Sequence, residues 1–510
     1  MKDTVIILDF GSQVTQLIAR RVRAAHVFAE IRPYNVALEE LRRPEVRGVI
    51  FSGGPSAVYA KGAPLPRPGV FDLGKPILGI CYGLQVIARQ LGGHVQRGEN
   101  REYGKMILAR AKESPLFSGI PAKQTVWMSH GDVVTRPPDN FQVIGTSDNS
   151  PYAAIADEQR KIYGVQFHPE VWHSEYGAKI LQNFAKNICG AGQEWTMRHF
   201  IKEETEKIRL EVGKRQVVHA LSGGVDSTVL ALMLKHALPA RQVKNIFVDH
   251  GLLRQGEAEQ VLRDMKKLGL TVRKIHATRE FLSALEGVSD PETKRKRIGK
   301  EFVEALMKRV GARDFLSQGT LYPDVIESVS VHGPSATIKT HHNRAPEILE
   351  LLKEGRVIEP LKELFKDEVR ELGKELGMPE EIVWRHPFPG PGLGIRILGE
   401  VTPERLDILR QADAIFIEEI RRAKLYREIA QAFAALDTSR AVGVKGDERE
   451  LGYMILLRAV TTQDFMTADW YRFEPDFLAR VANRIVNEVR GVTRVLYDIT
   501  QKPPATICYM

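Results

Sequence analysis

Short, nearly continuous apolar runs alternate with amphipathic stretches over residues 1–190. The runs VIILDF (5–10), GVIFSGGP (48–55) and PILGIC (76–81) each end in a turn or at the start of a helix. Between the first two, QLIARRVRAA (16–25) repeats its apolar positions at helical spacing. Apolar strands that alternate with helices are typical of a parallel sheet covered on both faces. We therefore predict a doubly wound parallel sheet in this part of the chain.

The same alternation starts again after NICGAGQEW (187–195). Strand-like VVHALSGG (217–224), helical TVLALMLKHAL (228–238) and strand-like VKNIFVDHG (243–251) follow one another as a βαβ unit. This pattern predicts a second doubly wound parallel sheet.

A proline- and glycine-rich segment, HPFPGPGLG (386–394), suits neither a helix nor a strand, and the alternation of strands and helices ends there. Helical LDILRQADAIFIEEIRRA (406–423) and the strand-rich end GVTRVLYDIT (491–500) follow it. The predicted fold class is α/β, with two doubly wound parallel-sheet domains followed by a smaller α+β domain. We expect their boundaries at residues 1–194, 195–385 and 386–510.

Composition limits the class of protein, its partners and its cellular compartment. The chain has 510 residues, 43% hydrophobic and 27% charged, which is typical of a soluble globular protein of about three domains. Its net charge of +9 is mild and spread out, which suits anionic small substrates and does not require nucleic acid. The uncharged runs are shorter than the roughly twenty residues that span a bilayer, so we expect no membrane partner. The three cysteines, at 81, 189 and 508, cannot form a disulfide framework. We expect a cytoplasmic protein.

The first candidate for chemistry is a cysteine between a strand and a helix. In PILGICYGLQVIARQLGG, Cys81 lies at the strand-to-helix turn and is flanked by Gly79 and Gly83. A helix start presents N–H groups and a partial positive charge, which stabilise a thiolate and a developing oxyanion. A buried structural cysteine is the alternative, because free cysteine packs well in cores.

A second segment, YGVQFHPE (163–170), favours the catalytic interpretation. An apolar strand ends at His168, and Glu170 follows two residues later. A thiol nucleophile needs a base, and the base needs a carboxylate that orients it. The sequence therefore predicts a Cys–His–Glu triad.

Five segments occur in the order seen in class I glutamine amidotransferases, and they cover about the first 190 residues. They are DFGSQ (9–13), FSGGPSAVY (51–59), GICYGLQ (79–85), MSHGD (128–132) and GVQFHPE (164–170). By this resemblance Cys81 attacks the glutamine amide, His168 acts as general base and acid, and Glu170 orients His168.

The same resemblance implies four further positions in the glutaminase. The backbone N–H groups of Gly53 and Tyr82 would form an oxyanion hole, and Gln85 and Asp132 would hold the bound glutamine. The chain departs from the family pattern at Ala57, beside this loop.

The second candidate is a phosphate-binding loop, SGGVDS, between a strand and a helix. Two glycines allow a close approach of the backbone, and the serine hydroxyls and the helix start add donors. The loop lacks the lysine of a P-loop, and it resembles the signature of ATP pyrophosphatases, which cleave ATP between its α and β phosphates. A plain glycine turn is the alternative. The ATP-binding positions implied are Ser222, Gly223, Gly224, Val225, Asp226, Ser227, Thr228 and Val248, the last placed at the carboxyl end of the next strand.

Seven further motifs resemble the GMP synthetase family over nearly the full chain. They are GEAEQVL (256–262), FLSALEGVSDPETKRK (281–296), QGTLYPDVIES (318–328), EPLKELFKDEVRELG (359–373), RHPFPGPGLGIR (385–396), DFMTADW (464–470) and KPPATI (502–507). The resemblance implies that xanthosine monophosphate is activated as an adenylyl ester and that ammonia converts it to guanosine monophosphate. It also implies Mg²⁺ with ATP, whose ligands remain unassigned, and a homodimer formed through the last domain.

Within this resemblance, six residues are candidates for the acceptor nucleotide. Arg295 and Lys502 carry positive charge that suits its phosphate dianion. Asp324 and Lys339 match positions around the activated nucleotide, and Thr506 and Ile507 belong to the KPPATI motif.

Two departures concern this acceptor pocket. The family tail usually reads KPPATIEWE, but this chain ends KPPATICYM, so Cys508 replaces a carboxylate. The lid usually reads IKSHHNVGGLP, but here Arg344 follows Asn343 directly. We expect weaker or altered acceptor binding and an altered closure of the lid.

Other classes of protein share parts of this pattern. A tRNA thiolase shares the SGGxDS loop but carries cysteines in its synthetase half, and residues 190–507 contain none. A ligase that makes CTP shares the glutaminase but lacks the loop. A regulatory protein with a decayed glutaminase would lack a triad residue, and all three are present. Another ATP pyrophosphatase ligase, acting on a different acceptor, remains as the alternative.

Overall fold

The computed structural model describes residues 2–329, 346–445, 447–462, 465 and 467–509. The chain divides into two compact units. The first is built on Met1–Phe200, together with helix α10 (Tyr322–Val329). The second is built on Ile201–Leu321 and the described residues from 346 onward. Each unit is described below by itself.

The first unit contains a nine-stranded mixed sheet in the order β2-β1-β3-β4-β9-β8-β7-β5-β6. The strands from β2 to β9 are parallel, which confirms the predicted parallel sheet. Four strands extend it in antiparallel fashion, which the sequence did not predict, because a long two-stranded ribbon lacks the alternation with helices. The strands are β1 (Thr4–Asp9), β2 (Phe28–Pro33), β3 (Val46–Phe51), β4 (Ile77–Ile80), β5 (His94–Arg110), β6 (Lys123–Arg136), β7 (Gln142–Thr146), β8 (Ala154–Asp157) and β9 (Ile162–Val165).

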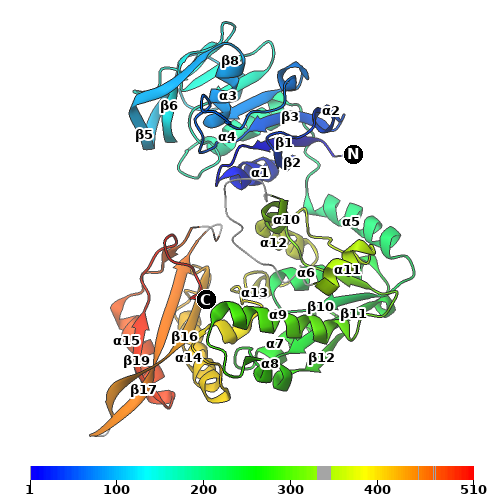
Figure 1. Ribbon diagram of the computed structural model, residues 1–510, viewed down its shortest axis with the longest axis vertical. Coiled ribbons are helices and arrows are strands. Elements are labelled where there is room, and N and C mark those ends of the chain that lie inside the picture. The colour runs from blue at the N-terminus through cyan, green and yellow to red at the C-terminus, as the bar shows by residue number, and fades with distance from the viewer. Residues whose placement is uncertain (1, 330–345, 446, 463–464, 466, 510) are drawn as a thin grey trace. The chain divides into compact units, whose positions relative to one another are not determined.

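Different helices cover the two faces of the parallel strands (Figure 1). A Cβ atom built on Gly79 would lie 2.5 Å from the backbone of Gly83, so this face packs against α3. A Cβ atom built on Gly48 would lie 2.3 Å from the Cys189 sulfur, so the other face packs against the helices that end there. The helices are α1 (Thr15–Ala24), α2 (Leu38–Arg42), α3 (Tyr82–Gln90), α4 (Gly177–Gln182) and the π-helical η3 (Asn183–Ile188).

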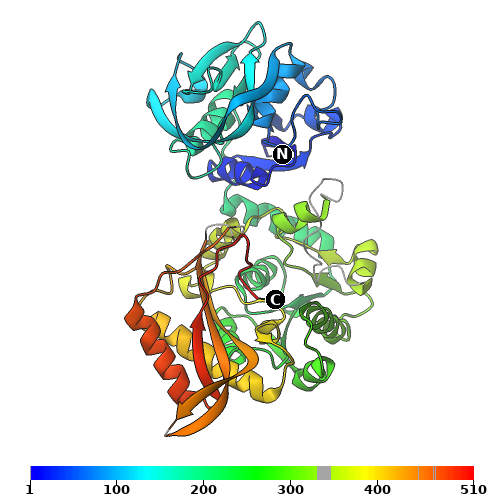
Figure 2. The ribbon, with the colours of Figure 1, turned by 60° about the vertical axis from the view of Figure 1, so that its left-hand side comes forward.

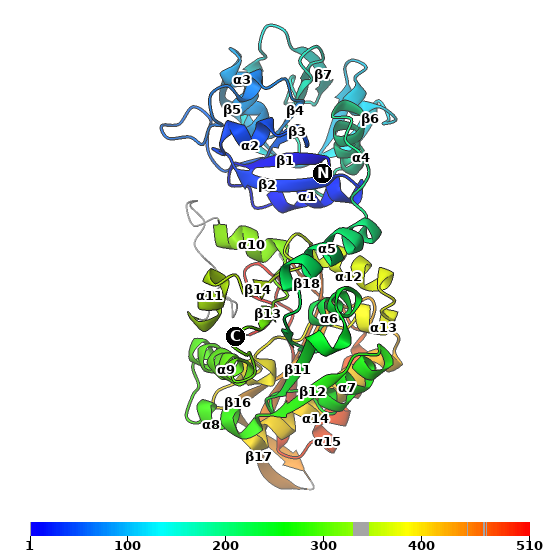
Figure 3. The ribbon, with the colours of Figure 1, turned by 90° about the vertical axis from the view of Figure 1, so that its right-hand side faces the viewer.

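The second unit contains a five-stranded parallel sheet in the order β12-β11-β10-β13-β14, as predicted. Figure 3 shows α6 and α7 on one side of these strands and α8 and α9 on the other. The strands are β10 (Val217–Ala220), β11 (Val243–Asp249), β12 (Val272–His276), β13 (Phe315–Ser317) and β14 (Val357–Ile358). The helices are α5 (Met197–Val212), α6 (Val225–Ala237), α7 (Glu257–Lys267), α8 (Thr278–Leu285), α9 (Pro291–Met307), α11 (Pro346–Lys353), α12 (Lys366–Glu375) and α13 (Glu380–Val383).

A smaller, mixed sheet completes the second unit (Figure 2). It contains β15 (Ile397–Leu398), β16 (Gln431–Lys445), β17 (Glu448–Thr461), β18 (Asp469–Trp470) and β19 (Val492–Tyr497). Helix α14 (Pro403–Arg422) packs on β16, and α15 (Pro475–Glu488) packs on β19 and α14. The predicted α+β character is therefore confirmed. The proline- and glycine-rich segment at 386–394 leads into one short 3₁₀ turn, η6 (Gly392–Ile395).

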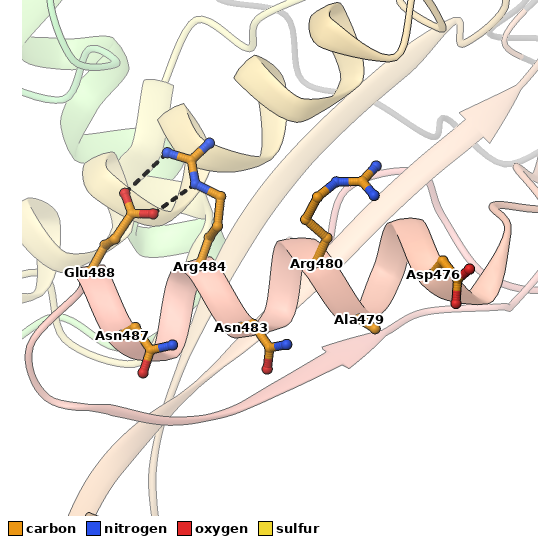
Figure 4. A pocket seen from close by; sticks show the side chains of 7 residues that line it. All are labelled: Asp476, Ala479, Arg480, Asn483, Arg484, Asn487 and Glu488. Atoms are coloured by element: carbon orange, nitrogen blue, oxygen red, sulfur yellow. Dashed lines mark hydrogen bonds and ion pairs between the residues drawn. The ribbon is translucent and has the colours of Figure 1, made fainter.

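Helix α15 carries a shallow hollow on its outer side (Figure 4). Arg484 pairs there with Glu488 at 2.7 Å and also reaches Glu419 of α14 at 2.8 Å. The hollow contains none of the predicted site residues, and its ion pairs join the two helices. Among the described residues, no helix has both the length and the apolar character that a membrane crossing requires.

Candidate functional sites

Cys81 lies at a strained turn between β4 and α3. It is the N-cap of the helix and has φ +52°, a conformation that non-glycine residues rarely adopt. The close approach of strand and helix requires both flanking glycines. A Cβ atom on Gly79 would lie 2.5 Å from the Gly83 backbone, and one on Gly83 would lie 2.5 Å from the Phe51 carbonyl oxygen. The turn presents the sulfur at the positive end of α3.

His168 and Glu170 lie where β9 ends, within reach of Cys81. His168 Nδ1 is 2.7 Å from Glu170 Oε1, and both side chains are buried. Burial disfavours a charge on the imidazole, but the Glu170 carboxylate, the Cys81 sulfur and hydrogen bonds to both raise the pKa of His168 well above its ordinary value. The imidazole is therefore held protonated beside the sulfur. A histidine oriented by a carboxylate beside a cysteine sulfur is the arrangement that activates a cysteine nucleophile.

Strand β6 fixes the surroundings of this pair. The His168 backbone N–H donates to the Trp127 carbonyl oxygen at 2.9 Å, and the Ser174 hydroxyl donates to the His168 carbonyl oxygen at 2.6 Å. The Cys81 sulfur lies 3.8 Å from the Ser129 carbonyl oxygen, and the Gln166 amide donates to it at 3.7 Å. The sulfur is therefore bordered by polar groups from two segments of the chain, β6 and the residues after β9.

The other predicted glutaminase residues gather around the same place. A Cβ atom on Gly53 would lie 3.1 Å from His168 Cε1 and 3.8 Å from Cys81 Cβ, so the Gly53 backbone borders both residues. Tyr82 is the first residue of α3. The Gln85 amide donates to the Asp132 carbonyl oxygen at 3.1 Å, which joins the two positions expected to hold glutamine.

Two features of this site were missed by the sequence analysis. The Tyr59 hydroxyl donates to Asp132 Oδ1 at 2.9 Å, and His130 pairs with Glu102 at 3.0 Å. Tyr59 and His130 stand in quoted motifs, which is the only signal that could have found them. Glu102 carried no signal, because its role depends on the pairing of β5 with β6.

In the second unit, the SGGVDS loop connects β10 to α6 and is braced by its own hydroxyls. Ser222 N–H donates to Ser227 Oγ at 3.2 Å, and Gly224 N–H donates to Ser222 Oγ at 3.3 Å. Ser227 and Thr228 hydroxyls donate to the Gly224 carbonyl oxygen at 3.1 and 2.8 Å. Gly223 has φ +77°, which favours glycine. Val225 and Asp226 begin the helix, so its N–H groups open toward the loop.

Basic side chains from distant segments complete the loop. Lys366 of α12 donates to both carboxylate oxygens of Asp226, at 2.6 and 2.5 Å. Arg385 donates to the Gly223 carbonyl oxygen at 2.9 Å and to Asp264 at 2.6 Å. Neither residue was singled out from the sequence, although both stand in quoted motifs, because nothing in those motifs pointed to the loop.

A buried histidine supports the loop from beneath. His219 of β10 is fully buried, and burial lowers its pKa to about 4, so the ring is neutral. Its Nε2–H donates to the Ser227 carbonyl oxygen at 2.9 Å, and Nδ1 lies 2.9 Å from Ser317 Oγ. Val248 lies at the carboxyl end of β11, as predicted. The last residue of this strand, Asp249, pairs with Lys274 at 2.8 Å, which the sequence did not predict.

The acceptor candidates fall in three places. Arg295 lies on α9, while Lys502, Thr506 and Ile507 lie in the tail after β19. Asp324 lies on α10, which belongs to the first unit. Lys339 and the altered lid after Asn343 lie outside the described residues. Lys502, Thr506 and Ile507 lie together in one described segment of the second unit.

Arg458 of β17 holds this tail in place. Its side chain is fully buried and donates to the carbonyl oxygens of Thr500 at 2.6 Å and Thr506 at 3.2 Å. Lys502 donates to the Phe465 carbonyl oxygen at 2.6 Å, and Ile507 packs with Phe433. The half-buried Cys508 lies at the end of this ordered tail. Arg458 was missed because an arginine in a strand carries no signal of its partners.

Three stretches of the chain match known protein families. Residues 6–188 match the family model Glutamine amidotransferase class-I, residues 196–309 match NAD synthase, and residues 418–509 match GMP synthase C terminal domain. Proteins named GMP synthase [glutamine-hydrolyzing] from Brucella suis and Brucella abortus are 54% identical to this chain over 99% of it and 98% of their own length. The crystal structure of one putative GMP synthase component, from Thermoplasma acidophilum, is 31% identical, with a TM-score of 0.35, and covers 37% of this chain and 95% of that chain.

The elbow cysteine with its histidine–glutamate pair, followed by the pyrophosphatase loop, defines a glutamine amidotransferase fused to an ATP-using synthetase. Identity over almost the whole length of both chains narrows this class to one family. The chain belongs to the glutamine-hydrolysing GMP synthases.

Proposed function

We propose that this enzyme releases ammonia from glutamine at Cys81 and transfers it to xanthosine monophosphate activated by ATP. The observation that carries the first half is the 2.7 Å contact between His168 and Glu170 beside the Cys81 sulfur. The braced SGGVDS loop at the start of α6 supports the second half. The products are guanosine monophosphate, AMP, pyrophosphate and glutamate.

In the glutaminase, the Cys81 thiolate attacks the carboxamide carbon of glutamine. The backbone N–H groups of Gly53 and Tyr82 are proposed to donate to the oxyanion that forms, with the positive end of α3 stabilising it. Gly53 borders both His168 and Cys81, and Tyr82 begins α3, which supports this assignment. His168 gives its proton to the leaving ammonia and then takes one from the water that hydrolyses the thioester. Glu170 keeps the ring oriented and favours its charged form.

In the synthetase, the loop from Ser222 to Thr228 binds the phosphates of ATP through its N–H groups and hydroxyls. Lys366 and Arg385 bring positive charge to the same loop. The oxygen donors of Asp226, Ser222 and Ser227 suit Mg²⁺. Bound with ATP, this ion supplies charge that neutralises the leaving pyrophosphate.

For the acceptor, Arg295 and Lys502 are proposed to hold the nucleotide phosphate, with Thr506 and Ile507 beside it and with Asp324 and Lys339 near the activated base. Arg458 supports this assignment, because it orders the tail that carries three of these residues. Cys508 stands where the family has a carboxylate, so a weaker affinity for the acceptor is proposed.

The assay with ATP, xanthosine monophosphate and ammonium tests the reaction directly. We expect AMP and pyrophosphate in equal amounts, whereas release of ADP would contradict the proposal. Cys81→Ala is expected to abolish synthesis from glutamine and to leave synthesis from ammonium intact. Cys189→Ala is the matched control, because Cys189 is buried behind Gly48 and should leave both activities unchanged.

We also propose a cytoplasmic homodimer formed through the C-terminal sheet. Apolar side chains at the hairpin end of β16 and β17 remain exposed on one face, namely Val442 at 41%, Val444 at 73% and Leu451 at 57%. Exposed apolar side chains gathered on one sheet favour burial against another protein surface. Light scattering should give twice the chain mass of 57.4 kDa, and Val444→Lys with Leu451→Lys should reduce it to a monomer.

A further inference from the structure

The glutaminase unit contains a second histidine–carboxylate pair, which the triad does not use. Glu102 of β5 and His130 of β6 stand directly opposite each other in the antiparallel ribbon, with Glu102 Oε2 3.0 Å from His130 Nε2. Glu102 is 0% exposed and His130 is 5% exposed. A buried carboxylate is costly unless its oxygens are satisfied. The hydroxyls of Ser147 and Ser150 donate to it at 3.3 and 2.7 Å.

The second ring nitrogen of His130 points at the backbone of its own strand. His130 Nδ1 lies 3.1 Å from the Asp132 carbonyl oxygen, which can only accept, so Nδ1 carries a proton. Nε2 faces the Glu102 side chain, so a hydrogen bond joins this nitrogen to Glu102. Burial lowers the pKa of His130, and the Glu102 carboxylate is the group that opposes this effect. Glu102 therefore fixes the orientation of the ring.

The Asp132 carbonyl oxygen, which accepts from His130 Nδ1, lies among the residues expected to hold glutamine. It also accepts the Gln85 amide at 3.1 Å, and the Asp132 carboxylate accepts the Tyr59 hydroxyl at 2.9 Å. One residue before His130, the Ser129 carbonyl oxygen lies beside the Cys81 sulfur. The ring of His130 thus anchors the stretch of β6 that borders both the nucleophile and the Asp132 side chain.

We propose that Glu102, acting through His130, is a positioning residue for glutamine. It holds β6 so that the Asp132 carboxylate meets the α-ammonium group of the substrate while the carboxamide lies against Cys81. A carboxylate at a fixed position suits an ammonium group. This inference rests on the proposed binding role of Asp132. Glu102 touches no substrate atom, so its loss changes binding of glutamine rather than the chemistry of the thiolate.

Matched substitutions separate positioning from general stability. Glu102→Ala removes the partner of Nε2, whereas Glu102→Gln can donate its amide to Nε2 and keeps Nδ1–H on Asp132. We expect the KM for glutamine to rise at least tenfold in Glu102→Ala with kcat within threefold, and Glu102→Gln to recover most of the loss. Synthesis from ammonium should be unchanged in both variants. An unchanged KM in Glu102→Ala, or an equal loss in Glu102→Gln, would overturn the proposal.

A second pair of variants covers the case in which Glu102→Ala fails to fold. His130→Asn places an amide near the position of Nδ1 and keeps a donor for the Asp132 carbonyl oxygen. His130→Gln places its amide near Nε2 and loses that donor. We expect His130→Asn to bind glutamine more tightly than His130→Gln, and equal values of KM would contradict the role of the Asp132 contact.

Alkylation of Cys81 distinguishes this inference from the proposed function. The glutamine analogue 6-diazo-5-oxo-norleucine carries the α-ammonium group, whereas iodoacetamide does not. In Glu102→Ala the analogue should need at least tenfold higher concentration for half-maximal labelling of Cys81, as followed by mass spectrometry, while labelling by iodoacetamide stays within threefold. Equal loss with both reagents would refute positioning. No labelling of the unsubstituted enzyme by the analogue would refute the glutaminase itself.

Discussion

Lys366 donates to both carboxylate oxygens of Asp226, at 2.6 and 2.5 Å, although 140 residues separate them along the chain. The contact ties α12 to the first turn of α6, where the phosphates of ATP are proposed to bind. Both side chains remain about one third exposed, so their pairing by itself adds little to stability. The contact matters because it fixes the positions of two charged side chains beside the SGGVDS loop.

Substitution of Lys366 tests this relationship. Lys366→Met should lower synthesis from glutamine and from ammonium alike by about 100-fold, because a preorganised charge at the leaving phosphates is lost. Glutaminase activity should remain, since the triad lies in the other unit. Lys362→Met, on a neighbouring position outside the loop, is the control. A fall in glutamine-dependent synthesis alone would show that Lys366 does not serve the ATP site.

Removal of the Glu170 charge should change the pH dependence of glutamine hydrolysis. The raised pKa of His168 depends on the Glu170 carboxylate and the Cys81 sulfur. In Glu170→Gln the imidazolium loses its proton at a lower pH, so the alkaline limb of the pH–rate profile should move toward acid. We expect kcat to fall by about tenfold to 100-fold as well. A profile of unchanged shape would contradict the assigned cause.

The elbow should not tolerate a methyl group at Gly83. Gly83→Ala places Cβ 2.5 Å from the Phe51 carbonyl oxygen, so backbone must move. We expect the free energy of unfolding to fall by about 2 kcal/mol, with loss of glutaminase activity. Gly192→Ala is the matched control, because its Cβ would meet its nearest neighbour at 3.5 Å. Urea unfolding of both variants measures the difference, and equal stability would show that the turn relaxes freely.

A buried lysine should make stability depend on pH. Lys294 of α9 is 0% exposed and donates to the carbonyl oxygens of Gly394 at 3.2 Å, Ile397 at 2.7 Å and Gly399. Burial lowers its pKa from 10.5 to about 8. Between these values the unfolded chain holds the proton and the folded chain does not, so this group stabilises the fold progressively as pH rises.

Lys294→Met removes that dependence. From pH 7.5 to pH 10 the enzyme should gain stability relative to Lys294→Met, by up to about 3 kcal/mol for a shift of this size. Urea unfolding at each pH gives the comparison. A constant difference between the two proteins would mean that the ammonium group is not disfavoured by its burial.

At both sites the local turn could be predicted from the sequence, but the distant partners of that turn could not. The strand–turn–helix pattern around Cys81 and around SGGVDS could be recognised because each motif is formed by neighbouring residues. The structure places both turns as expected. The partners that complete them, Glu102, His219 and Lys366, arrive from strands or helices far along the chain. Their residue types are common, and only strand pairing and helix packing bring them to the loops.

The sequence by itself determined the α/β class, the presence of two parallel sheets, the two strand–turn–helix motifs that carry chemistry, and the family resemblance. Local spacing decides these features, because apolar periodicity and glycine-flanked turns are properties of short segments. Only the tertiary structure decided the antiparallel ribbon of β5 and β6, the pairing of Glu102 with His130, and the hold of Arg458 on the tail. Those depend on which strands become neighbours and on the burial of charged groups that must then find partners, and no short segment records either.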